Sequence, residues 1–228
     1  MDEAFAGFEP GALRLLADLR RHNDRAWFAP RKERFERELF GPLRALVTDA
    51  TEALRRAKIP LGGDPKRSVF RIYRDVRFGH DKSPFKTHLA AYLSYDGNRD
   101  TPGGLYVHVE PGRSRISAAF YRVEKPALLR WHAAIVDRPA AFRAVVRALA
   151  KRGVPLMGPD AWEDSYARVP RAYVDRAPVD LAPYLRLRSF VAGRDIADDE
   201  LASPAAVAAI VRLAKDARPL LDFGWALI

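Results

Sequence analysis

The sequence predicts an α+β protein in which an antiparallel β-meander is covered by N-terminal and C-terminal helices. Two observations support this prediction. Four strand-like runs, rich in β-branched and aromatic residues or alternating between apolar and polar ones, follow one another between residues 69 and 123. Leucine-rich stripes at helical spacing precede and follow these runs. A meander flanked in this way is expected to bury one face of its sheet against the helices.

The N-terminal part of the chain predicts helices. Residues 12–20 carry leucines at helical spacing, and Pro10 suits the entry to that helix. Asp24 is placed to cap a second helix, and Pro30 is placed to open a longer one. Gly41-Pro42 interrupts the longer helix, so we expect a kink or a restart there.

The predicted strands of the meander span residues 69–73, 89–95, 104–110 and 114–123. Pro111-Gly112 supplies a turn between the last two. The polar connection between the first two is long for a hairpin loop, and its Gly79 permits a tight turn. Binding groups concentrate in loops that are held on a rigid sheet, so we expect a candidate binding site in this connection.

The C-terminal half predicts helices at residues 126–136 and from Pro139 to Gly153. Repeated prolines between residues 154 and 185 predict little regular structure there. Residues 185–192 alternate and predict a further strand, and Ser203-Pro204 predicts the start of a closing helix. No repeat, low-complexity tract or linker divides the chain, so we expect a single domain over residues 1–228.

Composition narrows the class of protein. The chain has 228 residues, of which 48% are apolar and 30% charged, as expected for a folded domain. It has no cysteine, which excludes disulfides, thiolate catalysis and cysteine-ligated zinc. The acidic start lacks a signal pattern and no apolar run is long enough to span a bilayer, so we expect a cytoplasmic protein without a membrane partner. The sequence gives no indication of the oligomeric state.

The chain is basic, with a formal net charge of +10 and a sequence pI of about 10.1. A positive net charge favours polyanionic partners, because it attracts them over long distances. The positive charges are nevertheless spread along the chain and form no lysine-rich tail. A generally arginine-rich composition therefore explains the charge better than a nucleic-acid partner does.

The stretch from residue 69 to residue 95 combines aromatic and charged residues more densely than any other part of the chain. Arginine forks match the paired oxygens of carboxylates and phosphates, so several arginines in one place favour an anionic ligand. The predicted ligand-binding residues are Arg25, Arg71, Arg74, Arg77, Lys82 and Lys86. If the site is catalytic, Asp75 or Asp81 is the candidate general base. Whether the protein is an enzyme stays open.

Three interpretations of this stretch compete. The first is a pocket for an anionic small molecule that carries phosphate or carboxylate. The second is a nucleic-acid or protein interaction module, in which Phe70, Tyr73, Phe78 and Phe85 stack beside the basic residues. The third is a purely structural charge network, in which Asp75 pairs with Arg74 or Arg77 and Asp81 pairs with Lys82 or Lys86.

Several kinds of chemistry are disfavoured by missing motifs. The histidines have no ligand spacing known for metal sites, so a site of His80, Asp81 and His88 would require convergence in space, and we expect no metal. There is no Gly-x-Ser-x-Gly elbow and no Gly-x-Gly-x-x-Gly after a strand. Serine hydrolase chemistry and dinucleotide binding are therefore disfavoured, and no cofactor is predicted.

The same stretch resembles a known family. Its pattern is Phe70-Arg71-Ile72-x-Arg74-Asp75-x-Arg77-Phe78-x-x-Asp81-Lys82-x-Pro84-Phe85-Lys86-Thr87, and it is preceded by Asn23-Asp24-Arg25-x-Trp27-Phe28 with Lys32 and Phe35. Together these segments resemble the domain of unknown function 2461 family, a group of conserved hypothetical bacterial proteins. The resemblance spans most of the chain and implies a single α+β domain. It implies no particular reaction.

The two segments of the resemblance are expected to meet in space. Strand alternation places Arg71 and Tyr73 on one face and Phe70 and Ile72 on the other. The helix start at Asn23-Asp24 offers free backbone N–H groups, which suit an anion. We therefore predict that the cluster from Arg71 to Lys86 faces the Asn23–Phe28 turn, with Arg25 in the same cleft.

Overall fold

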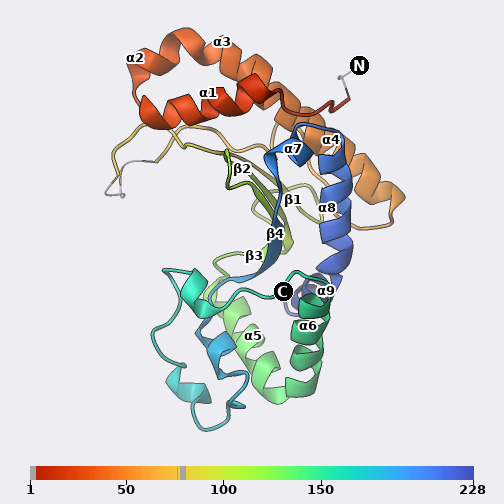
Figure 1. Ribbon diagram of the computed structural model, residues 1–228. Coiled ribbons are helices and arrows are strands. Elements are labelled where there is room, and N and C mark those ends of the chain that lie inside the picture. Colours follow the sequence, from red (N-terminus) through yellow and green to blue (C-terminus); the bar gives the residue numbers. More distant parts are fainter. Residues whose placement is uncertain (1–3, 76, 78–80) are drawn as a thin grey trace. The chain divides into compact units, whose positions relative to one another are not determined.

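The computed structural model describes residues 4–75, 77 and 81–228. It confirms the α+β class, with helices at both ends of the chain and a four-stranded antiparallel sheet in the order β1-β2-β3-β4. The strands are β1 (Leu89–Leu93), β2 (Gly104–Val109), β3 (Arg115–Phe120) and β4 (Phe190–Asp195). Because β1 to β3 are also consecutive in the chain, the predicted meander is confirmed (Figure 1).

The described residues group into two compact units. The first is formed by the described residues within Met1–Thr101, Leu105–Ile116 and Asp195–Arg212, and the second by Pro102–Gly104, Ser117–Arg194 and Leu213–Ile228. The candidate functional residues all lie in the first unit. No helix in the described part of the chain has both the length and the apolar character needed to cross a bilayer.

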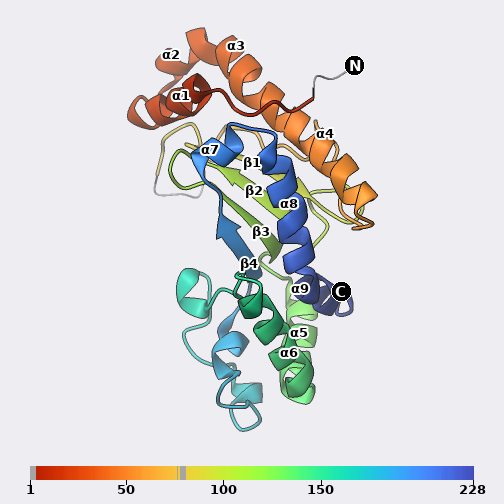
Figure 2. The same ribbon diagram turned by 45° about the vertical axis from the view of Figure 1, so that its right-hand side comes forward.

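The first unit begins with α1 (Pro10–Arg21), whose leucine stripe is buried as predicted. The Asp24 carboxylate accepts a hydrogen bond from the backbone N–H of Trp27 at 2.8 Å and caps α2 (Arg25–Phe28). The chain continues in helical conformation through α3 (Lys32–Phe35) to α4 (Gly41–Arg56). In Figures 1 and 2, α1 lies beside this helical run.

The predicted interruption at Gly41-Pro42 is present as a π-helical turn at Glu36–Phe40, directly before α4. Proline cannot donate a backbone hydrogen bond, so the regular helical ladder has to change near this point. The apolar face of α4 then packs on β1, and its Leu43, Leu46 and Leu54 are buried.

Strand β1 is buried along its whole length, and it pairs with β2 in the register Leu89↔Val109, Ala91↔Val107 and Leu93↔Leu105. The predicted strand at residues 69–73 is only partly formed. It makes isolated bridges from Val69 to Ala91 and from Tyr73 to Phe85. Val69 and Tyr73 are four positions apart in the sequence, whereas their partners Ala91 and Phe85 are six positions apart. A bulge therefore interrupts the ladder between the two bridges.

The second unit contains α5 (Lys125–Asp137), α6 (Pro139–Lys151) and α9 (Arg218–Trp225), which pack on one another around aromatic residues. The Trp131 ring stacks on Phe190 with centroids 3.9 Å apart. Gly224 is needed at this core because a Cβ atom there would lie 2.2 Å from the Phe120 ring. The predicted ends of α5 and α6 are confirmed to within a residue or two.

The predicted strand at residues 185–192 is misplaced. Ala182–Arg186 forms a 3-10 turn, and β4 begins only at Phe190. Pro183 favours the start of a helical turn, and the alternation of Leu185 and Leu187 reflects two buried side chains on a compact turn. The short helix α7 (Asp198–Leu201) and the closing helix α8 (Ala205–Asp216) follow β4, and Ser203-Pro204 precedes α8 as predicted.

Candidate functional site

The turn at Asn23–Phe28, called the N-terminal turn below, lies against the stretch from Val69 to Tyr95, called the central motif below, as predicted. The side-chain amide of Asn23 donates to the backbone carbonyl of Phe85 at 2.9 Å and accepts from the backbone N–H of Phe85 at 3.0 Å. The Phe28 ring stacks on Phe85 with centroids 4.2 Å apart. This double hydrogen bond and the ring contact fix the backbone of the motif at Phe85, immediately before Lys86.

Arg25 is on the same turn, but its side chain is exposed. The contacts that join the turn to the motif come from Asn23 and Phe28 instead. The membership of Arg25 in a shared cleft therefore stays a prediction.

The loop part of the motif contains charge pairs that lie close in sequence. Arg77 makes two side-chain hydrogen bonds to Asp75, at 3.0 and 2.7 Å, and Arg74 pairs with Asp81 at 2.5 Å. The Asp81 carboxylate also accepts hydrogen bonds from the backbone and the hydroxyl of Ser83. Asp75, Arg77, Asp81 and Lys82 are all exposed, and the interpretations placed on Phe78, Gly79 and His80 lie outside the described residues.

These pairs affect the proposed role of the two aspartates. Hydrogen bonds from Arg77 lower the pKa of Asp75 to about 2. Hydrogen bonds from Ser83 lower the pKa of Asp81. A carboxylate whose charged form is held this firmly takes up a proton poorly at neutral pH. The catalytic assignment of Asp75 and Asp81 stays a prediction that this geometry does not favour.

Lys86 has a different environment. It is half-buried, and burial lowers the pKa of its ammonium group, as do the nearby charges of Arg71, Arg99 and Arg74. We call these four residues the Lys86 cluster. No ion pair among the described residues joins Lys86, Arg71 or Arg99 to a carboxylate.

An aromatic ring supports the cluster. The Lys86 Nζ lies 5.5 Å from the centroid of the Phe70 ring, and the Arg99 Cζ lies 5.6 Å from the same centroid. Cations are attracted to the negative face of such a ring. Phe70 therefore holds two positive charges close together without neutralising them.

The cluster continues into a polar face of β1 and β2. Since Leu89 pairs with Val109, the preceding His88 falls on the same face as Tyr106, His108 and Glu110. The rings of His88 and His108 stack with centroids 4.4 Å apart, and His108 Nε2 lies 3.1 Å from a carboxylate oxygen of Glu110. Burial lowers the pKa of His88 to about 4, and the charges of His108 and Lys86 add to this effect.

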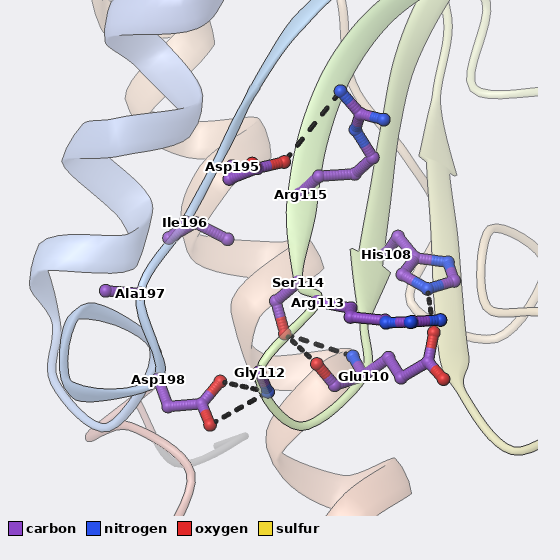
Figure 3. A pocket seen from close by; sticks show the side chains of 10 residues that line it. All are labelled: His108, Glu110, Gly112, Arg113, Ser114, Arg115, Asp195, Ile196, Ala197 and Asp198. Atoms are coloured by element: carbon purple, nitrogen blue, oxygen red, sulfur yellow. Dashed lines mark hydrogen bonds and ion pairs between the residues drawn. The ribbon is translucent and has the colours of Figure 1, made fainter. Parts of the chain in front are cut away.

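A cavity of about 850 Å³ lies next to this face and includes His108 and Glu110 in its wall (Figure 3). The rest of its lining comes from the turn between β2 and β3, the first residue of β3, the last residue of β4 and the segment that follows it. The lining residues are His108, Glu110, Gly112, Arg113, Ser114, Arg115, Asp195, Ile196, Ala197 and Asp198. The Ser114 hydroxyl accepts from the Glu110 N–H and donates to the Glu110 carbonyl, while Asp198 accepts from the Gly112 N–H. These contacts make the turn a firm wall for a polar ligand.

Sequence reasoning missed four residues of this region: Arg99, Tyr106, His108 and Glu110. The last three had a usable signal, because polar residues at every second position of 104–110 share one face of a strand. Arg99 had none, since it lies in the loop between β1 and β2 and reaches Phe70 only through the fold. In the described part of the chain, no group of three or more His, Asp or Glu residues is arranged to hold a metal ion.

Comparison with known proteins assigns the chain to a family. No curated protein and no solved structure matches it. One family model, described as Conserved hypothetical protein (DUF2461), matches residues 11–223 and so includes nearly the whole of both compact units. The protein belongs to this family of conserved hypothetical proteins, as the two sequence segments had indicated.

Proposed function

We propose that the protein binds an anionic small molecule, through a phosphate or carboxylate group, at the Lys86 cluster. One observation carries the proposal: a half-buried lysine has three arginines, and no carboxylate, as the charged neighbours that shift its pKa. Because Lys86 is partly shielded from water, the positive charges of the arginines near it repel its ammonium group. A bound anion removes this repulsion.

The hydrogen bonding of Arg74 supports the same conclusion. Its Nε atom is buried and has no hydrogen-bond partner among the described residues, although its NH1 group pairs with Asp81. A buried donor without an acceptor costs free energy. An oxyanion in the cluster would supply the missing acceptor, and arginine forks suit the paired oxygens of such a group.

The geometry also ranks the competing functions. Stacking of a nucleobase requires a free aromatic face, and Phe70 already lies beside Lys86 and Arg99. Tyr73 and Tyr95 are 48% and 68% exposed and remain available to a nucleic acid. We favour a compact anion because the half-buried Lys86 has three arginines around it, whereas these tyrosines lie on the open surface.

A catalytic role would need a general base beside the bound anion. The imidazole of His108, which contacts Glu110 and lines the cavity, meets this need better than the paired carboxylates of Asp75 and Asp81. The proposal itself concerns binding and does not depend on catalysis.

The experiment is a thermal-shift and calorimetric screen with sulfate, pyrophosphate, citrate and a random single-stranded oligonucleotide. A ligand that binds only the folded protein raises its stability by about 2.7 kcal/mol at a concentration of 100 times the Kd. We expect Lys86→Met to weaken the binding of the compact anions at least about tenfold, as expected for the loss of a shielded charge-assisted hydrogen bond.

The matched control is Lys58→Met, which removes the same charge from an exposed position at the C-terminal end of α4. It should bind the same anions with nearly unchanged affinity. Equal losses in both variants would show that the anions respond only to net charge and would refute the site. Tight binding of the oligonucleotide alone would favour the nucleic-acid interpretation.

A further inference from the structure

His88 connects the Lys86 cluster to the polar face of the sheet. It lies directly before β1, two residues after Lys86, and its ring stacks on His108. The charged and titratable groups that act on it come from three segments. Lys86 lies on its own segment, Arg74 lies on the chain that runs beside β1, and His108 and Glu110 lie on β2.

We propose that His88 is a ligand-binding residue of the Lys86 cluster, and that it takes up a proton when a doubly charged oxyanion such as a phosphate monoester binds there. This inference rests on the proposed function, because it concerns the same site. It adds a binding residue, a class of ligand and a coupling between binding and pH.

The surroundings of His88 keep its ring neutral when no anion is bound. Burial disfavours the charged form of the imidazole, and the positive charges of His108, Lys86 and Arg74 disfavour it further, while Glu110 favours it only in part. These effects bring the pKa of His88 to about 4, so the ring is neutral near pH 6 or 7. A neutral ring adds no charge to a cluster that is already crowded with cations.

A bound oxyanion offsets part of the Coulombic repulsion that acts on His88. Negative charge held by Lys86 and Arg74 offsets the repulsion that these two groups exert on His88. The imidazole can then accept a proton from solvent and donate a hydrogen bond toward the ligand. An opposite charge within about 4–6 Å typically changes a pKa by about 1–3 units, which would bring His88 close to pH 6.

This coupling selects among anions. A carboxylate carries one negative charge, so it offsets the repulsion on His88 less than a dianion does. A phosphate monoester carries a charge of about −1.5 to −2 at neutral pH and gains more from an additional imidazolium. The expected ligand is therefore a dianionic phosphate group rather than a simple carboxylate.

Sulfate is the probe for the test, because it remains a dianion throughout the pH range used and any proton must go to the protein. Its binding is measured by calorimetry at pH 5.5 and at pH 7, at each pH in two buffers of different ionisation enthalpy. If the His88 pKa rises by about two units, we expect uptake of roughly 0.7 proton at pH 5.5 and an affinity about fourfold higher at pH 5.5 than at pH 7.

Two histidine variants test whether His88 is the residue that takes up the proton. His88→Asn should abolish the uptake and make sulfate affinity independent of pH, while leaving weaker binding through the remaining cluster. His22→Asn removes an exposed imidazole from the end of α1 and should behave like wild type. Uptake that survives in His88→Asn and disappears in His108→Asn would move the proton to the other ring and overturn the proposal.

The remaining outcomes separate this inference from the proposed function. Sulfate binding that requires Lys86 but involves no proton uptake would overturn the role of His88 and leave the anion site intact. Sulfate that fails to bind wild type at any pH would overturn both. Acetate that binds with the same affinity and proton uptake as sulfate would overturn the preference for a dianion.

Discussion

The central motif has two parts with very different surroundings: the exposed loop that contains Asp75, Arg77 and Asp81, and the anchored half that contains Phe85, Lys86 and His88. In the loop, Arg77 and Asp75 pair with each other and are 75% and 41% exposed at their side chains. In the anchored half, Phe85 is buried against the N-terminal turn, and Lys86 and His88 are half-buried behind it. Arg77 is paired with a carboxylate in the loop, whereas the charges that shift the pKa of Lys86 are those of arginines.

This difference shows which property of a charged stretch points to a ligand. Both parts of the motif carry basic side chains. What separates them is whether each cation finds a carboxylate within the protein and whether water can reach it. Exposed ion pairs contribute little to stability or to specificity, while shielded unpaired cations favour a partner from solution.

The largest expected effect comes from removing the anchor. Phe85→Ala deletes a buried ring that stacks on Phe28 and contacts Tyr73, so we expect a loss of about 3–5 kcal/mol in the free energy of unfolding. Urea denaturation followed by fluorescence measures it. Tyr95→Ala is the control, because that ring is 68% exposed and should cost far less. Similar losses in both variants would contradict the anchoring role of Phe85.

The next effect concerns the polar part of the anchor. Asn23→Ala leaves the backbone N–H and carbonyl of Phe85 without their partner, and we expect a loss of about 1–3 kcal/mol. Asn23→Asp keeps an acceptor for the Phe85 N–H but loses the donor to the Phe85 carbonyl. Its stability should lie between wild type and Asn23→Ala, and a ranking in any other order would count against this pair of hydrogen bonds.

A smaller effect should appear in the pH dependence of stability. The pKa of His88 is about 4 in the folded protein and near 6.5 in the unfolded chain, so the unfolded chain binds more protons between these values. Stability should therefore fall as the pH is lowered from about 6.5 toward 4. His132, whose pKa is also lowered by burial, acts with the same sign.

The measurement is the difference in Tm between pH 7 and pH 5. His88→Asn should show a smaller difference than wild type, because asparagine does not titrate, and it should keep the contribution of His132. At pH 5 the carboxylates are still largely ionised, so they add little to the comparison. An unchanged difference in the variant would show that His88 is not held neutral in the folded protein.

The smallest effect is expected in the loop. Asp75→Ala removes the partner of Arg77 from an exposed position, and exposed pairs contribute little because water and salt screen them. We expect no change in Tm beyond the experimental error and little change in anion binding. A cooperative loss of structure in this variant would instead restore the interpretation of the motif as a structural charge network.

Much of the fold could be predicted from local patterns. The leucine stripe of α1, the cap at Asp24 and the prolines that open α5 and α6 each act within a few residues, so the sequence is enough to place them. The strand at residues 69–73 and the one at 185–192 were less well predicted. Regular strands depend on partners that are distant in sequence, and a bulge or a 3-10 turn can produce the same alternation.

For the site, the sequence by itself determined the chemistry: a stretch of arginines and lysines with aromatic residues, suited to an anion, near a turn that begins with Asn23. Only the tertiary structure decided which of these charges are available. It paired Arg77 with Asp75 in the exposed loop, and it placed Arg99 and the polar face of β2 beside Lys86 and His88. Pairing and burial depend on distances between residues far apart in the chain, and no periodicity within one segment encodes those distances.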